Sequence, residues 1–259
     1  MSVLVRPIAV ALALLAAGAA QAGTCPRPGT LGVSRVLPVE VGADGLFVGT
    51  KSYPDTLPLA DHEIVLSFDD GPAGKTTDAV LAALEAECVK ATFFVVGEMA
   101  AAHPEQLRRM AAAGHTIGHH TMTHTILTKV PFERGEADVE TGWQTVDRIL
   151  TGTAGDRPKT PFFRYPGFAA TKPLDAWLTE RRVAVFGADF WGSDWNKSTP
   201  EALLALTLSR IEARGRGILL LHDTHDYTAA MVPGLLAALK AKGWRVVQIV
   251  PAPPPATGG

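Results

Sequence analysis

Ionisable side chains gather at several points along the chain, and each point closely follows a short apolar run. They are Asp69-Asp70, His119-His120 with His124, Arg164, Asp189 with Asp194, and His222-Asp223. In parallel α/β folds the carboxyl ends of the strands face one common mouth. If each apolar run is a strand, these groups should therefore converge on a single site.

Two histidines and a carboxylate could bind a divalent metal. His120 and His124 are four residues apart, so a helical segment would place both imidazoles on one face. Two histidines and one carboxylate are a common catalytic metal set. The adjacent carboxylates of Asp69 and Asp70 would also repel each other unless cations compensate. We therefore predict a metal held by Asp70, His120 and His124. The alternative ligand pairs are His119/His124 and His222/His225.

A metal at this point would turn the neighbouring groups into a hydrolytic site, because it polarises a carbonyl and lowers the pKa of bound water. Asp69 could accept the proton of that water, and His222 could protonate a departing amine. Asp194 could keep the imidazole of His222 charged, and Arg164 could keep Asp69 ionised. The backbone N–H of Gly167 could help to bind the oxyanion.

Composition narrows the classes of partner. The 259 residues carry a formal net charge of −2, which argues against nucleic acid or an anionic membrane surface as partner. Nucleotide-binding glycine loops and the G-x-S-x-G elbow are absent, and two cysteines cannot build a cysteine-rich zinc site. Trp191 and Trp195 fall in an expected rim loop, where they could stack on a sugar.

Alternating strand and helix patterns extend over most of the chain. We expect strands at 64–68, 92–96, 115–118, 162–165, 183–186, 218–221 and 246–250. We expect helices at 77–86, 105–113, 134–150, 172–181, 200–215 and 231–242. Such repeats predict parallel strands joined by right-handed crossovers. About seven units fit either a doubly wound sheet or a closed or distorted (β/α) barrel, and periodicity does not choose between them.

The first residues are typical of an export signal. Arg6 precedes an apolar run at 8–17, and Ala20-Gln21-Ala22 offers a cleavage site. We therefore predict a signal peptide over 1–22, a secreted or periplasmic protein, and no stable membrane insertion after cleavage. An uncleaved membrane anchor is the alternative, but the apolar stretch falls short of the roughly 20 residues that a spanning helix needs.

Other segments flank the expected catalytic domain at 62–250. An extension at 23–61 contains two strand-like runs, 36–41 and 46–48, and Ala43-Asp44-Gly45 between them suggests a hairpin. A Pro-rich tail at 251–259 should lack regular structure. Export would permit a disulfide between Cys25 and Cys88, although two buried thiols fit the sequence equally well.

Five short motifs resemble those of the polysaccharide deacetylases, the NodB-like carbohydrate esterases, and occur in the family's order. They are Ser67-Phe68-Asp69-Asp70-Gly71-Pro72, His120-Thr121-Met122-Thr123-His124, Phe163-Arg164-Tyr165-Pro166-Gly167, Asp194-Trp195 and Leu220-Leu221-His222-Asp223. The resemblance implies a distorted (β/α)7 barrel and one divalent metal, often zinc, on Asp70, His120 and His124. It further implies roles for the remaining residues: Asp69 as base, His222 as acid, Arg164 oriented on the base, Asp194 tuning His222, and Trp195 with Leu220 lining an acetyl pocket.

The motifs depart from the family pattern at three positions. Ser67 replaces a threonine but keeps the hydroxyl, and His119 replaces an asparagine and could add a titratable group. Gly167 takes the place of a tyrosine, which removes a side chain that shapes the substrate groove. The third change leaves the preferred substrate open.

These residues predict an enzyme that hydrolyses N-acetyl groups of an N-acetylglucosamine-containing polysaccharide or oligosaccharide to acetate and free amine. One alternative is an O-acetyl esterase acting on xylan. The other is a glycan-binding protein with a metal but no turnover. The presence of every ionisable group that the chemistry needs favours an enzyme.

Overall fold

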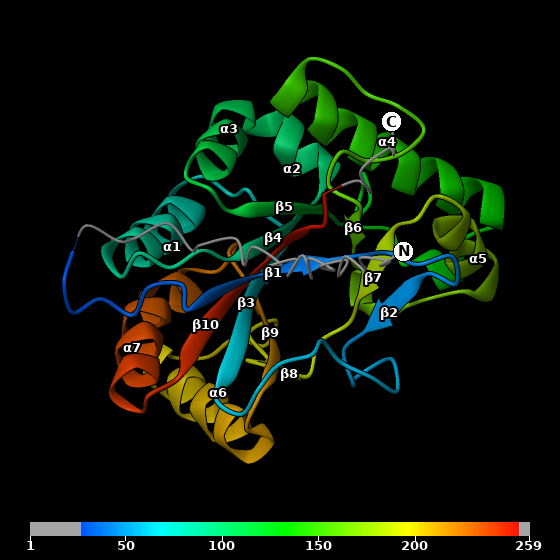
Figure 1. The fold of residues 1–259 in the computed structure, drawn as a ribbon. Coiled ribbons are helices and arrows are strands. Elements are labelled where there is room, and N and C mark those ends of the chain that lie inside the picture. Colours follow the sequence, from blue (N-terminus) through cyan, green and yellow to red (C-terminus); the bar gives the residue numbers. More distant parts are fainter. Residues whose placement is uncertain (1–26, 254–259) are drawn as a thin grey trace, which may run out of the picture.

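The computed structural model describes residues 27–253, in which helices pack around a sheet whose strand pairings are all parallel (Figure 1). The predicted signal peptide, Cys25 and residues 254–259 lie outside the described part of the chain. Cys88 is disulfide-bonded, while its pairing with Cys25 stays a prediction. Within residues 27–253, no helix has the length and apolar character required to cross a bilayer.

Seven parallel strands of the described chain form the sheet that carries the predicted site residues. In order across this sheet they are β8 (Phe190–Trp191), β9 (Gly217–His222), β3 (Glu63–Asp69), β4 (Thr92–Val95), β5 (Thr116–His119), β6 (Phe162–Phe163) and β7 (Ala184–Phe186). The end strands β7 and β8 are joined by residues 187–189 alone. Such a link spans no more than about 14 Å, so the two edges must lie close together. The sheet therefore curves into a distorted (β/α) barrel, and a doubly wound sheet is excluded.

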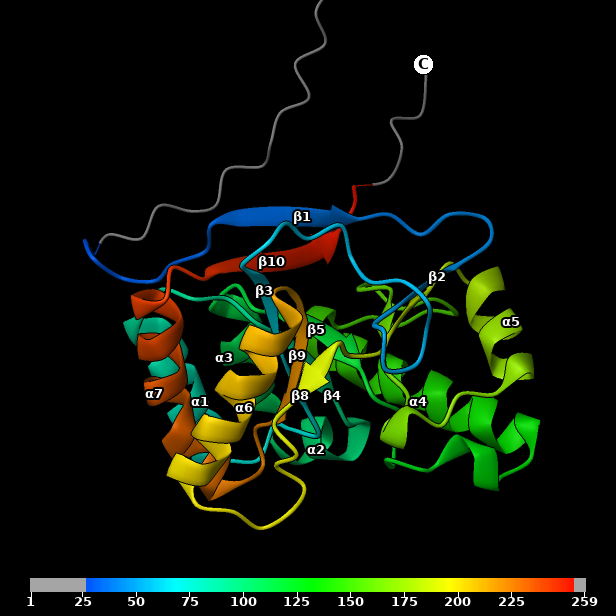
Figure 2. The same ribbon diagram turned by 90° about the horizontal axis from the view of Figure 1, so that it is seen from below.

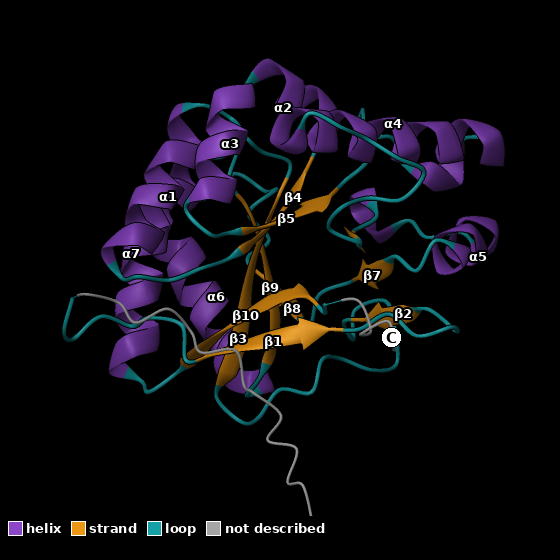
Figure 3. Ribbon diagram, turned by 45° about the horizontal axis from the view of Figure 1, so that its top comes forward, coloured by secondary structure: helices purple, strands orange, loops and turns teal. Residues whose placement is uncertain are grey.

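The helices lie outside this barrel and form an arc around the strands (Figure 3). They are α1 (Lys75–Ala86), α2 (Gly97–Ala102), α3 (Pro104–Ala112), α4 (Phe132–Thr151), α5 (Lys172–Glu180), α6 (Pro200–Arg214) and α7 (Asp226–Ala241). Leu84, Leu107, Ile211 and Leu236 are fully buried in the layer between helices and sheet. This packing makes the barrel a rigid support for residues at its strand ends.

Local sequence signals place the ends of several helices as expected. The hydroxyl of Thr199 accepts a hydrogen bond from the N–H of Ala202 at 3.2 Å, and Gly215 ends α6 with a φ of 77°. Helix α7 begins five residues before the predicted start at 231. Its first turn is held by tertiary contacts, because Tyr227 and Thr228 both donate hydrogen bonds to Asp194. The short elements α2 and β8 were not predicted.

The predicted hairpin in the extension is wrong. Strand β1 (Arg35–Val39) pairs in parallel with β10 (Arg245–Pro251), and β2 (Leu46–Val48) pairs in parallel with β7. A turn does form at 43–44, but each strand then finds a partner on the barrel, where Val39 and Val48 become buried. The predicted tail is also wrong at Pro251, which pairs with Val39 as the last residue of β10.

The pair β1–β10 lies at the amino end of the barrel, opposite the predicted site. Arg245 and Val246 pair with Glu63 and Ile64, the first residues of β3. Figure 2 shows β1 and β10 crossing one end of the other strands. Apolar side chains from the extension and β10 join the inner strand residues in one cluster, so this end of the barrel is filled.

The extension also covers the seam between β7 and β8. Asp189, in the link between these strands, is buried and accepts hydrogen bonds from the N–H of Thr50 at 3.0 Å and its hydroxyl at 2.8 Å. Its second oxygen accepts from the hydroxyl of Thr56 at 2.5 Å and the N–H of Ile218 at 2.8 Å. One carboxylate thus fastens the extension to both sides of the seam.

Removing this carboxylate should destabilise the fold. We expect Asp189→Ala to lower the free energy of unfolding by about 2–4 kcal/mol, because buried donors lose their acceptor. Chemical denaturation followed by circular dichroism measures the change. Asp44→Ala, at an exposed turn of the same extension, is the control and should stay within about 0.5 kcal/mol of wild type. Equal stability of the two variants would contradict the role given to Asp189.

Candidate functional site

The carboxyl ends of the barrel strands surround a pocket of about 420 Å³. Asp69 and His222 are the last residues of the neighbouring strands β3 and β9 and are directly paired in register. The pocket is lined by Lys51, Asp69, Asp70, His120, His124, Tyr165, Gly167, Phe168, Trp195, Leu220, His222 and His225. Eight of the ten predicted site residues are therefore in the lining, and the other two, Arg164 and Asp194, are buried behind it.

Asp70, His120 and His124 form a group that could hold a metal ion. Their ligand atoms all lie within 4.8 Å of one another. Oδ1 of Asp70 is 3.5 Å from Nε2 of His120 and 3.3 Å from Nε2 of His124. This oxygen is buried and has no hydrogen-bond partner within the described residues, as expected for an atom that faces a cation.

A hydrogen bond and burial of the imidazole make His120 suitable as a metal ligand. Its Nδ1 lies 2.7 Å from the carbonyl oxygen of Arg164, which fixes the proton on Nδ1 and leaves the lone pair of Nε2 toward Asp70. Burial lowers the pKa of His120 and outweighs the nearby carboxylates, so the imidazole stays neutral. Neutral imidazole is the form that binds metal, and the donor set therefore fits a divalent cation.

The helical spacing that suggested the metal pair is not how the two histidines meet. The segment from His120 to His124 is a loop, and Thr121 and His124 have φ values of 66° and 56°. Backbone hydrogen bonds to neighbouring elements hold this loop, including Gly97 N–H to the carbonyl of Thr121 and Met122 N–H to the carbonyl of Asp138. The prediction that the residues converge is confirmed, but its helical rationale is wrong because tertiary contacts set the backbone.

Arg164 binds one oxygen of Asp69, while the other oxygen, Oδ2, lies 3.8 Å from Nε2 of His120. The guanidinium is fully buried, and its Nη1 donates to Oδ1 of Asp69 at 2.7 Å and to the hydroxyl of Ser67 at 2.9 Å. Its other donors reach the carbonyls of Phe186 and Gly187 in β7 and the link that follows it. The ion pair with Arg164 fixes the position of the Asp69 carboxylate. Asp69 is thereby suited to take a proton rather than to share a metal.

His222 faces the pocket from the end of β9, next to Asp69 on β3. Its Nδ1 lies 2.8 Å from Oδ1 of Asp194, whose other oxygen accepts from the backbone N–H of His222 and the hydroxyl of Thr228. Burial lowers the pKa of His222, but the hydrogen bond and charge of Asp194, with further help from Asp69 and Asp70, raise it to about 9. The imidazole is consequently protonated near neutral pH and can donate from Nε2.

The structure also locates the positions that depart from the family pattern. His119 is buried at the end of β5 and does not line the pocket; burial lowers its pKa to about 4. It therefore adds no charge near neutral pH. Tyr165 lies in the lining and donates from its hydroxyl to Asp175 at 2.9 Å, while Gly167 adopts a left-handed φ of 59°.

Four lining residues were not predicted as site residues. Tyr165 was quoted only as part of the third motif. Lys51 comes from the extension, Phe168 follows the third motif, and His225 was considered only as an alternative metal ligand. His225 stacks on the ring of Tyr227 at 5.1 Å. No spacing rule could have placed Lys51, because its segment reaches the pocket only through the tertiary contacts at the seam.

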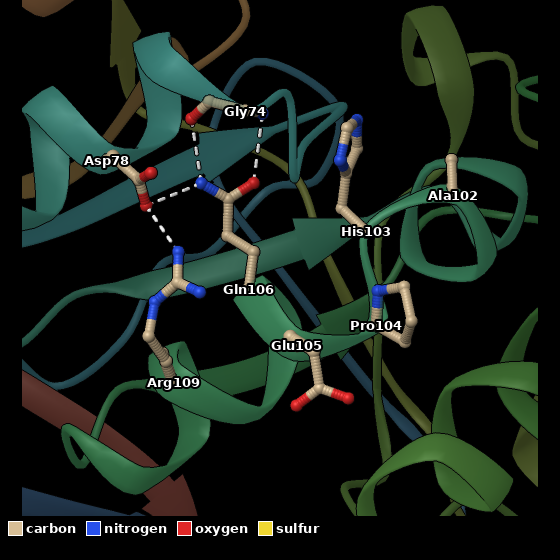
Figure 4. Close-up of a pocket in the computed structure, with 8 residues that line it drawn as sticks. All are labelled: Gly74, Asp78, Ala102, His103, Pro104, Glu105, Gln106 and Arg109. Atoms are coloured by element: carbon tan, nitrogen blue, oxygen red, sulfur yellow. Dashed lines mark hydrogen bonds and ion pairs between the residues drawn. The ribbon is translucent and has the colours of Figure 1, made fainter.

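The segment after Asp70 is clamped from outside the barrel by Gln106 of α3 (Figure 4). The side-chain oxygen of Gln106 accepts from the N–H of Gly74 at 2.9 Å, and its nitrogen donates to the carbonyl of Gly74 at 2.7 Å. The same nitrogen donates to Asp78, which also pairs with Arg109 at 2.8 Å. The clamp fixes the turn that leads from Asp70 into α1.

A barrel with this set of acids, bases and possible metal ligands defines a hydrolase site of the carbohydrate deacetylase type, and comparison with known proteins agrees. The profile of the polysaccharide deacetylase family matches residues 57–180. A chitooligosaccharide deacetylase of Sinorhizobium fredii is 31% identical over 70% of this chain and 87% of its own length. The chain therefore belongs to the polysaccharide deacetylase family, a family of hydrolases.

Further relatives support the same assignment. A chitooligosaccharide deacetylase of a Bradyrhizobium species is 29% identical over 78% of this chain and 94% of its own. The solved structure of a Bdellovibrio bacteriovorus peptidoglycan deacetylase is 33% identical, with a TM-score of 0.76, over 88% of this chain and 62% of that one. The likeness confirms the predicted distorted (β/α)7 barrel and the predicted family.

The ligand group should bind one divalent ion per chain. We expect zinc titrated into the metal-free protein to bind with a stoichiometry of about one, and His124→Ala to weaken binding at least about tenfold. Isothermal titration calorimetry measures both. His225→Ala is the matched control, because His225 lines the same pocket outside the ligand group, and it should leave zinc affinity unchanged. Equal losses in both variants would contradict the assigned ligands.

The contact between His222 and Asp194 should set the alkaline limit of activity. A general acid works while protonated, so activity falls as the pH rises through its pKa. Asp194→Asn removes the carboxylate that is the main cause of the raised pKa of His222. The pKa of His222 should therefore fall, and activity should begin to decline at a lower pH than in wild type. The pH profile of kcat measures the shift. An unchanged alkaline limb in an active, folded variant would argue against His222 as the acid.

Proposed function

We propose that this protein removes N-acetyl groups from an N-acetylglucosamine-containing polysaccharide or oligosaccharide, giving acetate and a free amine. The proposal rests on one observation, which is that two adjacent carboxylates have different contacts. Asp70 faces two imidazoles, whereas Asp69 is bound to Arg164 and lies outside that group. Relatives described as chitooligosaccharide and peptidoglycan deacetylases support the substrate class.

We further propose that Asp70, His120 and His124 hold one divalent metal, with zinc the expected ion. When bound, such an ion polarises the amide carbonyl and lowers the pKa of a bound water. The donor set of one carboxylate and two imidazoles, with positions left open for substrate, is typical of catalytic zinc and related metals.

The chain's own residues then account for the proton transfers. Asp69, held in position by its ion pair with Arg164, accepts the proton of the attacking water. His222, kept charged by Asp194, donates a proton to the amine as the C–N bond breaks. An amine is a poor leaving group without that proton, so an imidazole that is protonated near neutral pH suits amide hydrolysis. The backbone N–H of Gly167, on the pocket lining, is the candidate donor to the oxyanion.

Apolar residues of the pocket suit an acetyl group. Leu220 is nearly fully buried beneath the pocket, and Trp195, 48% exposed, stands at its rim with its ring centroid 6.1 Å from that of His222. A methyl group packed between these side chains would bring the acetyl carbonyl toward Asp69 and His222. The indole also offers a face on which a sugar ring could stack.

We propose that the protein acts after export, in a secreted or periplasmic location. Support comes from the basic, apolar and small-residue pattern of residues 1–22. The formal net charge of the chain, −2, fits an acetylated glycan as partner better than nucleic acid.

The base assignment has a direct test. Asp69→Asn keeps the size of the side chain but cannot accept a proton, so acetate release from a chitooligosaccharide in the presence of zinc should fall at least about 100-fold. An acetate-coupled assay measures the rate. Circular dichroism and zinc titration serve as controls, because the variant should stay folded and still bind metal. Substantial turnover by Asp69→Asn would refute the assignment of the base.

A further inference from the structure

Lys51 reaches the active-site pocket from the extension that precedes β3. It lines the pocket together with the predicted catalytic residues, which come from the barrel itself. It is the only lysine or arginine among the described residues that line this pocket. The extension therefore supplies a cation to the substrate-binding face.

The backbone of Lys51 is fixed rather than carried on a loose loop. Its N–H donates to the carbonyl of Ala188 at 2.8 Å, within the link between β7 and β8. The preceding residue, Thr50, is held by two hydrogen bonds to the buried Asp189. The N–H of Gly49 donates to the carbonyl of Asp55 at 2.8 Å, which closes the loop around Lys51. This anchoring sets where the side chain begins.

The ammonium group of Lys51 lies over aromatic rings. Its Nζ is 4.1 Å from the ring centroid of Trp191 and 5.5 Å from that of Phe168. These cation–π contacts orient the side chain. Within residues 27–253 no carboxylate or carbonyl accepts a hydrogen bond from Nζ. The positive charge is thus placed at the pocket while its N–H donors remain available to a ligand.

Neither carboxylate in the pocket is an ion-pair partner of Lys51. Asp69 is paired with Arg164, and Asp70 faces the two imidazoles of the ligand group. An uncharged glycan would offer Lys51 only hydroxyl and amide oxygens, for which a neutral donor would serve as well. A carboxylate on the substrate would give it a partner of opposite charge and match its single charge.

We propose that Lys51 is a specificity residue that binds a carboxylate on a sugar next to the one being deacetylated. This inference rests on the proposed deacetylase function and narrows its substrate class to acidic acetylated glycans. The aromatic rings hold the ammonium in place, and the hydrogen bond to the carboxylate forms when the glycan occupies the pocket.

Matched substrates test the proposal. One is an oligosaccharide of alternating N-acetylglucosamine and N-acetylmuramic acid with free carboxylates, and the other is the same oligosaccharide with each carboxylate converted to a primary amide. Lys51→Met keeps an apolar side chain on Trp191 but removes the charge, and Lys51→Arg keeps the charge. Lys197→Met is the control, because it removes an exposed lysine close in sequence to Trp195 that does not line the pocket. Acetate release gives kcat and KM for each combination.

Wild type should prefer the free carboxylate, and Lys51→Met should lower kcat/KM for that substrate about threefold to fivefold, mainly through KM. The amidated substrate should respond little, Lys51→Arg should retain most of the preference, and added salt should weaken it. Loss of preference only in Lys51→Met supports the proposal.

Other outcomes overturn it. If Lys51→Met affects both substrates equally, the lysine only packs against Trp191. If Lys197→Met has the same effect as Lys51→Met, general charge rather than contact sets the preference. Wild-type turnover of both substrates without preference would refute this inference alone, whereas no acetate from either substrate or from chitooligosaccharides would count against the proposed function itself.

Discussion

The buried ion pair between Asp69 and Arg164 is the contact on which the proposed chemistry depends. Two neighbouring carboxylates would otherwise repel each other and compete for the same cation. Arg164 binds one of them at 2.7 Å, and the imidazoles of His120 and His124 approach the other. The guanidinium is itself fixed by Ser67 and by carbonyls of the β7 segment. Identical side chains at adjacent positions thus acquire different tasks from their surroundings alone.

The barrel is what makes that contact available. Asp69 ends β3 and Arg164 follows β6, and strands β4 and β5 lie between them in the sheet. The two side chains meet because the sheet is strongly curved. The same curvature brings the edges β7 and β8 close, and there the carbonyls of Phe186 and Gly187 accept hydrogen bonds from Arg164. A flatter sheet would separate these groups. The seam is therefore part of the site, and the extension that covers it supports the arginine indirectly.

The sequence predicted the parts of the molecule that follow local rules. The main strands are apolar runs bounded by turn residues, and α6 begins after its N-cap Thr199 and ends before its C-cap Gly215, as predicted. Residues at strand ends were placed together because parallel strands share one mouth. Features set by distant contacts were not predicted. The strands of the extension pair with β7 and β10, His124 meets His120 through a loop held by α2 and α4, and Lys51 arrives through Asp189.

Buried polar side chains with several hydrogen bonds fix the geometry of this site. Arg164 and Asp194 are fully buried, and each is matched by several hydrogen bonds, so neither can rotate away without leaving charges unsatisfied. By contrast, Oδ1 of Asp70, a residue of the pocket lining, is buried without a donor. Arg164 and Asp194 are thus satisfied by hydrogen bonds, whereas this carboxylate oxygen faces two imidazoles and has no donor of its own. In the proposed mechanism a cation would bind at this oxygen, and the hydrogen-bonded groups around it are already in place, which is the kind of preorganisation that favours catalysis.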